Sequence, residues 1–246
     1  MIAIYNLIFY QPIFNLLIFF YNIIPGHDVG VAIIVLTFLA RLILFPFTLQ
    51  SLRSQKAMQA LQPKMNELKE KYKNEKDKLA RATMELYKQE KVNPLSSCLP
   101  LLVQLPIFIA LYQAMMAGLE GKNLEMLYGF VTRPETVNVI AFGFLNLSKP
   151  NFVLALLAGL AQFVQSKGLI ITKQPKVPGA KDEAMLSMMN KQMVYLMPIM
   201  TVVIGASFPG GLTLYWLVTN VLTLLQQKLF LKNKPVKTVL VQVVKN

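Results

Sequence analysis

Charged residues, cysteine and histidine are all scarce in this 246-residue sequence. Charged residues make up 15% of it, against about a quarter in soluble domains, and 54% of it is hydrophobic. Cys98 and His27 are the only residues of their types. A single thiol excludes an internal disulfide and a cysteine-based metal cluster, so we expect neither a metal site nor another cofactor.

Sequence motifs of catalysis are missing as well. The chain has no glycine-rich phosphate loop, no HExxH or GxSxG motif, and no pair of carboxylates inside an apolar segment. We therefore expect that the protein is not an enzyme. Residues 1–12 also lack the basic start and the A-x-A pattern of a cleaved signal peptide, so a bacterial plasma (inner) membrane is the simplest location.

Long uncharged apolar runs alternate with charged stretches, a pattern typical of membrane proteins. The sequence predicts an all-α integral membrane protein, a five-transmembrane-helix bundle with a cytoplasmic helical hairpin and an N-terminal interfacial helix. The predicted segments are the outer-face interfacial amphipathic helix 1–28, span 1 at 29–50, the cytoplasmic hairpin 51–91, span 2 at 92–119, the outer connector 120–150, span 3 at 151–172, the cytoplasmic loop 173–191, span 4 at 192–208, span 5 at 212–227 and the basic cytoplasmic tail 228–246.

The first 24 residues are uncharged but interrupted by polar residues. At 100° per residue, Gln11, Asn15 and Asn22 fall on one narrow stripe, which favours a helix lying in the membrane interface. A sixth span is the alternative, because the segment is long enough to cross a bilayer.

The segment 51–91 carries 11 Lys and Arg residues. Apolar residues within it recur at alternating spacings of three and four, the seam of a coiled coil: Met58, Leu61, Met65, Leu68 and Tyr72. A helical hairpin is therefore predicted, ending at Asn93-Pro94.

The net charge of +13 would suggest nucleic acid binding in a soluble protein. In a membrane protein the excess marks cytoplasmic loops instead, so DNA is not an expected partner. The hairpin has 11 basic residues, the region 167–191 has five and the tail has five, whereas the other side has only Lys122, Arg133 and Lys149. The positive-inside rule then puts the N-terminus outside and the C-terminus in the cytoplasm.

Arg41 is the most informative single residue, because it lies near the middle of the first predicted span. A central arginine costs about 2.5–3.5 kcal/mol on insertion scales, and its guanidinium cannot lose its proton. No Asp or Glu lies inside any other predicted span to pair with it. We therefore expect Arg41 to face a water-filled cavity within the membrane.

Polar residues on the predicted spans can line such a cavity. Thr37 shares a helix face with Arg41, and Gln104 interrupts the second span. Trp216 and Asn220 belong to a polar stripe on the fifth span. For any one of these polar residues a hydrogen bond between helices is the simpler role, and Trp216 is equally suited to anchor its helix at the interface.

Four motifs resemble the YidC insertases of bacteria and their mitochondrial Oxa and chloroplast Albino relatives. They are TFLARLILFPFT at 37–48, LQPKMNELKEKYK at 61–73, KVNPLSSCLPLLVQLPIFIALY at 91–112, and FPGGLTLYWLVTN at 208–220, which is followed by Gln226-Gln227. The resemblance covers roughly residues 29–230 and is greatest to the bare core of the bacterial family.

The resemblance implies a five-helix core around a hydrophilic groove that opens to the cytoplasm and to lipid. The groove residues it implies, together with the spacing arguments above, are Arg41, Thr37, Gln104, Tyr215, Trp216 and Asn220. Arg41 would attract the polar tail of a nascent membrane protein client, which then crosses while its apolar segment enters lipid. The Sec translocon, membrane lipids and the ribosome are the further partners implied, and the basic tail suits either ribosomal RNA or anionic lipid.

Two other functions fit the sequence. A small anion channel or transporter would use Arg41 to bind a solute, and would show solute flux in vesicles. A structural subunit of a translocase would tolerate a change at Arg41.

Overall fold

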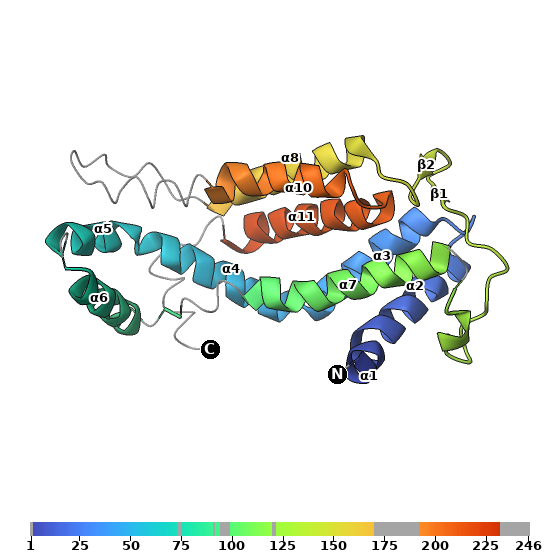
Figure 1. The fold of residues 1–246 in the computed structure, drawn as a ribbon, viewed down its shortest axis with the longest axis horizontal. Coiled ribbons are helices and arrows are strands. Elements are labelled where there is room, and N and C mark those ends of the chain that lie inside the picture. Colours follow the sequence, from blue (N-terminus) through green and yellow to red (C-terminus); the bar gives the residue numbers. More distant parts are fainter. Residues whose placement is uncertain are drawn as a thin grey trace. The chain divides into compact units, whose positions relative to one another are not determined.

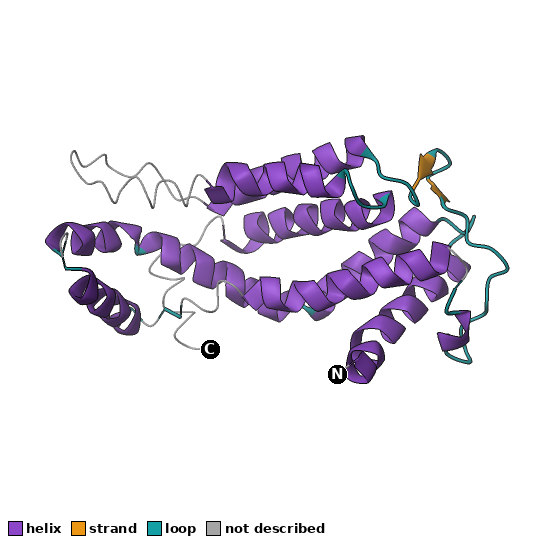
Figure 2. Ribbon diagram, viewed as in Figure 1, coloured by secondary structure: helices purple, strands orange, loops and turns teal. Residues whose placement is uncertain are grey.

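The computed structural model describes residues 2–72, 75–90, 92–93, 99–119, 122–169 and 192–231. The described chain is mostly helical, which confirms the helical class predicted from the sequence (Figure 2). The predicted loop 173–191, Cys98, Pro94 and the tail beyond Leu231 lie outside the described residues. The number of helices that cross the membrane, and the predicted segment boundaries, stay predictions.

The elements of Figure 1 follow one another along the chain. They are α1 (Ile2–Tyr5), a π-helical turn (Asn6–Tyr10), α2 (Gln11–Ile23), α3 (Val29–Ile43), α4 (Phe45–Ala60), α5 (Gln62–Lys71), α6 (Lys76–Gln89), α7 (Leu99–Leu119), a 3-10 turn (Leu124–Met126), β1 (Ile140–Ala141), β2 (Leu145–Asn146), α8 (Phe152–Leu169), a second π-helical turn (Gln192–Leu196), α10 (Met197–Gly205) and α11 (Gly210–Leu231).

The predicted span 29–50 is divided between α3 and α4, which meet at Leu44. Pro46 explains the break, because proline has no N–H to bond the carbonyl four residues earlier and its ring clashes with that carbonyl. Among the described residues, Ala3–Ile23 is long and apolar enough to cross a membrane alone, and α3 with residues 45–58 qualifies only as a pair. The apolar helices at 104–118, 152–168 and 194–205 are shorter.

The chain folds into two compact units. The first consists of Met1–Leu44, Leu101–Gln162 and Pro198–Leu222. Its core gathers buried side chains from α2, α3, α7, α11 and the connector between α7 and α8, among them Phe14, Ile33, Leu111, Leu147 and Leu212. Small residues allow close helix contact: a Cβ on Gly159 of α8 would lie 2.4 Å from Val202 of α10.

The second unit consists of Phe45–Pro100, Phe163–Met197 and Thr223–Asn246. Helices α5 and α6 contact each other, and Ala57, Leu61 and Val92 form a small buried cluster against which Met58 and Tyr87 pack. Leu61 and Met65 of the predicted seam are buried. The seam is not one continuous helix, since α4 ends at Ala60 and α5 starts at Gln62, next to Pro63.

The polar stripe of the N-terminal helix contacts the connector within the first unit. The Asn15 side-chain amide donates to the carbonyl of Met126 (3.0 Å) and its oxygen accepts from the Tyr128 N–H (2.5 Å). Gln11 donates to the same carbonyl, and Asn22 donates to that of Thr132. The stripe that predicted an interfacial helix is therefore occupied by protein, and the interfacial placement of residues 1–28 stays a prediction.

Candidate functional site

Helix α3 divides into an apolar face and a polar face around Arg41. Phe38 and Leu42 are 53% and 55% exposed, whereas Thr37 is buried and Arg41 is intermediate in exposure. One Arg41 nitrogen, Nη2, donates to the backbone carbonyl of Thr219 on α11 at 3.5 Å. The guanidinium therefore faces the first unit and not the exposed apolar side of its own helix.

Three polar side chains join Arg41 in one network in the first unit. The Gln104 amide of α7 donates to the Tyr215 hydroxyl of α11 at 2.5 Å. Tyr215 is also hydrogen-bonded to the side chain of Thr219, and it lies near enough to Arg41 for an electrostatic interaction. Residues of three helices, α3, α7 and α11, thus meet at one polar point in a largely apolar unit.

Arg41 has no carboxylate partner among the residues that the structure describes. The two ion pairs found there join Lys64 to Glu90 and Lys78 to Glu75, both in the α5–α6 region. A charge that is partly buried without an opposite charge is costly unless water or a binding partner solvates it. The arrangement therefore suits transient contact with an anionic or polar group brought from outside.

The other three predicted site residues have different contacts. The Thr37 hydroxyl donates to the Ile33 carbonyl of its own helix (2.6 Å). The Asn220 amide donates to the Ala158 carbonyl of α8 (3.2 Å), and the Trp216 ring packs edge-on against Phe108 with ring centroids 5.9 Å apart. Their printed contacts connect helices and do not join the Arg41 network.

Thr219 belongs to the network but was not among the predicted site residues. It lies one helical turn after Tyr215, so the two share a face of α11. That spacing is the sequence signal that could have identified it. The carbonyl contact with Arg41 has no residue-type signature, because every residue carries a backbone carbonyl.

A second group of buried polar residues lies in the other unit. Thr48 of α4 and Gln226 of α11 exchange hydrogen bonds, with the Gln226 amide donating to the Thr48 hydroxyl at 3.0 Å. Gln227 is also buried, and neither polar atom of its side chain has a partner among the described residues. The Gln226-Gln227 pair of the fourth motif thus includes one carboxamide between helices and one available for another partner.

Comparison with known proteins identifies the family. A family model described as "60Kd inner membrane protein" matches residues 19–237. The chain belongs to this family. Similar proteins named membrane protein insertase YidC come from Citrifermentans bemidjiense, 38% identical over 217 residues, and from Shewanella halifaxensis, 37% identical over 218 residues.

These matches cover most of this chain but a minor part of each relative. The aligned regions span 88% and 89% of this chain, and 35% and 36% of the two relatives. A crystal structure of an active YidC insertase with its first transmembrane domain resolved is similar in fold, with a TM-score of 0.62 and 25% identity. That match covers 92% of this chain and 46% of the other.

Proposed function

We propose that the chain inserts membrane proteins into a bacterial inner membrane and helps them to fold. Family membership supports the insertase activity, since the relatives above carry the name of membrane protein insertase YidC. The observation that carries the mechanism is Arg41, a permanent positive charge on an apolar helix with no carboxylate partner in the described parts of the chain.

Arg41 acts in this proposal by electrostatic attraction and not by a chemical reaction. A polar client tail enters a hydrophilic groove that opens to the cytoplasm and to lipid, and its acidic groups approach the guanidinium. Coulomb attraction at 4 Å is about 4 kcal/mol at an effective dielectric constant of 20, against about 1 kcal/mol in water. The tail then crosses the membrane as the client's apolar segment moves into lipid, which supplies most of the free energy.

Gln104, Tyr215 and Thr219 hold the polar side of the groove around Arg41. Their hydrogen bonds keep uncharged donors and acceptors beside the guanidinium, so that no fixed anion competes with a client. The basic hairpin 51–91 receives clients on the cytoplasmic side, with the Sec translocon or the ribosome as further partners. The N-terminus then lies outside and the C-terminus in the cytoplasm.

A reconstituted insertion assay tests the proposal. Purified protein in liposomes receives a single-span client with an acidic outer tail, and protection of that tail from protease is scored. Arg41→Ala should lower insertion roughly tenfold or more, because charge-assisted hydrogen bonds contribute about 1.5–3 kcal/mol. Arg133→Ala is the matched control, since Arg133 is exposed on the connector and distant in sequence from the network.

Two results would contradict the proposal. Protection no greater than in empty liposomes, with folding confirmed by thermal melting, would favour a channel or a structural subunit. Insertion of acidic-tailed clients by Arg41→Ala at the wild-type rate would remove the arginine from the mechanism and leave only the activity.

A further inference from the structure

The connector between α7 and α8 is hydrogen-bonded to the first turns of two helices in the first unit. The Gly210 and Gly211 N–H groups, at the start of α11, donate to the carbonyls of Lys149 (2.9 Å) and Leu147 (3.1 Å). Helix N-termini leave unpaired N–H groups that need such acceptors. At α3 the acceptor is the side chain of Asp28, which also binds the connector.

The two carboxylate oxygens of Asp28 have separate partners. Oδ1 accepts from the Gly30 and Val31 N–H groups (2.8 and 3.0 Å), which caps α3. Oδ2 accepts from the Phe142 N–H of the connector at 2.5 Å. Phe142 has a positive φ of 54°, an unfavourable conformation for a bulky residue that must be held by its surroundings.

Gly30 brings the connector against α3 at the same place. A Cβ on this glycine would lie 2.6 Å from the Cβ of Ala141 and 2.9 Å from the ring of Phe142. The backbone of α3 and the β1–β2 turn are therefore in direct contact beside the Asp28 carboxylate. Helix α3 and strand β1 also contact each other more widely.

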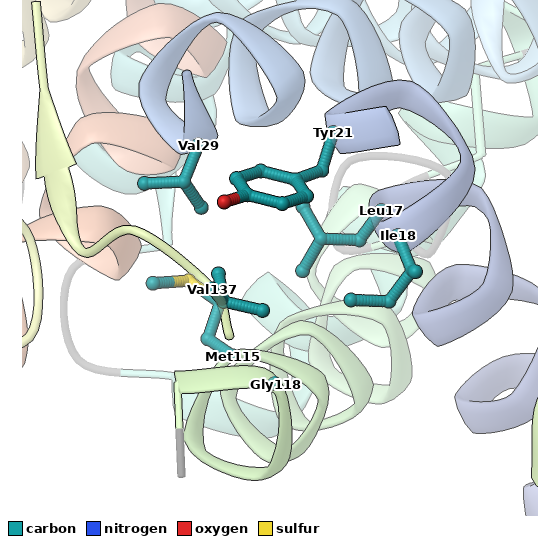
Figure 3. A pocket seen from close by; sticks show the side chains of 7 residues that line it. All are labelled: Leu17, Ile18, Tyr21, Val29, Met115, Gly118 and Val137. Atoms are coloured by element: carbon teal, nitrogen blue, oxygen red, sulfur yellow. The ribbon is translucent and has the colours of Figure 1, made fainter. Parts of the chain in front are cut away.

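Tyr21 of α2 attaches the connector at a second point. Its hydroxyl accepts from the Asn138 N–H at 2.8 Å and donates to the Thr136 carbonyl at 3.4 Å. Figure 3 shows the Tyr21 ring beside Val29 and across a small apolar pocket from Met115 and Val137. The connector is thus held by α2, α3 and α11 together.

The connector also contributes to the apolar core. Ala141 and Leu147 are completely buried, and they belong to the same cluster as Ile33, Met115 and Leu212. Arg41 follows Asp28 by thirteen residues, which corresponds to about 20 Å along α3. A packed apolar layer therefore separates the end of α3 that Asp28 caps from the turn that carries Arg41.

We infer that Asp28 is a positioning residue that holds the connector, as a seal against ions, over the ends of α3 and α11. The inference rests on the proposed function, which places this connector on the outer face and a hydrated groove around Arg41. Water and ions that reach Arg41 from the cytoplasm stop at the layer that contains Leu147 and Ala141. The Asp28 bond to Phe142 keeps these two side chains in register with that layer.

The division of labour between the two oxygens makes the inference testable. In Asp28→Asn the side chain keeps a single oxygen, which can cap α3 or accept from Phe142, while its NH₂ group would face an N–H donor. This variant thus preserves a good helix cap and removes the attachment of the connector. Tyr21→Phe removes the second attachment and keeps the ring that packs in the core. Glu135→Gln is the control, since it makes the same charge change at an exposed position of the connector.

Ion permeability of proteoliposomes without any client is the deciding measurement. A potassium diffusion potential is imposed, and proton entry is followed with an enclosed pH-sensitive dye. We expect a several-fold faster entry with Asp28→Asn, a smaller rise with Tyr21→Phe, and the wild-type rate with Glu135→Gln and with Arg41→Ala. Melting temperatures of all variants are measured alongside.

Folded Asp28→Asn and Tyr21→Phe proteins that are both as tight as wild type would overturn the inference. If Asp28→Asn does not fold, the milder Tyr21→Phe variant decides alone. A leak that appears equally in Glu135→Gln would also overturn it, because the cause would then be charge and not attachment. Since the leak is measured without a client, it can fail while the insertion assay succeeds, and the reverse.

Discussion

At the scale of single residues, Arg41 is where sequence and structure agree best. Its position in an apolar segment predicted an unusual environment, and in the structure it donates to a backbone carbonyl of another helix without a carboxylate partner in the described chain. Gln104 and Tyr215 do meet beside it. The proposed role follows from the permanent charge of the guanidinium, which keeps its proton at any physiological pH.

Gly30 permits a residue-scale prediction about stability. Gly30→Ala should lower the free energy of unfolding by about 1–3 kcal/mol, because its Cβ would overlap Ala141 in a packed contact. Thermal or denaturant unfolding in detergent measures the effect. Gly129→Ala is the control, since nothing lies within 4 Å of its added Cβ. Equal stability of the two variants would show that the connector yields easily at Gly30.

The limits of sequence prediction at this scale are physical. Asn220 and Trp216 were assigned to the groove because they share a helical stripe, but in the structure Asn220 donates to α8 and Trp216 packs on Phe108. Helical spacing specifies a face of one helix and not the neighbour that the face meets. The groove role of these residues and of Thr37 stays a prediction.

At the scale of elements, local sequence predicted helices well and their ends less well. The helical hairpin follows from its charge and apolar seam, and α5 contacts α6 as that pattern requires. The breaks at Leu44 and Leu61 were not predicted, although Pro46 and Pro63 follow each of them by two residues. A proline at the first turn of a helix is well tolerated, so it marks a start as readily as it interrupts a span.

Leu61 should be central to the stability of the hairpin. Leu61→Ala removes a side chain that is 2% exposed in the cluster with Ala57 and Val92, at a cost of about 2–5 kcal/mol. Limited proteolysis should then cut the hairpin faster than in wild type. Met84→Ala is the comparison, because Met84 is exposed and its loss should change stability by less than about 0.5 kcal/mol. Similar cleavage of both variants would contradict a packed hairpin core.

At the scale of the whole molecule, contacts distant in sequence determine what the N-terminal helix does. Its stripe of Gln11, Asn15 and Asn22 was interpreted as facing the interface, yet each residue binds the connector more than a hundred positions away. The periodicity was read correctly, but a polar stripe looks the same in sequence whether its partner is water or another segment. Family membership, in contrast, was predicted from four short motifs and is confirmed by the match over residues 19–237.

The membrane topology gives a prediction for the whole chain. Cys98 is the only native cysteine, so Cys98→Ser provides a background for single labels. In intact cells a membrane-impermeant maleimide should label Arg133→Cys on the connector and not Lys71→Cys on the hairpin. The basic hairpin is expected in the cytoplasm by the positive-inside rule. The opposite labelling pattern would invert the topology and, with it, the outer placement of the connector.

Charge reversal at Arg41 tests the central claim most directly. Arg41→Glu and wild type are reconstituted side by side, and each receives two clients that differ only in an acidic or a basic outer tail. If the guanidinium attracts client charge, Arg41→Glu should insert the acidic-tailed client poorly and the basic-tailed client better than wild type does. If both clients lose insertion equally while the variant remains folded, Arg41 supports the structure of the bundle and does not attract client charge.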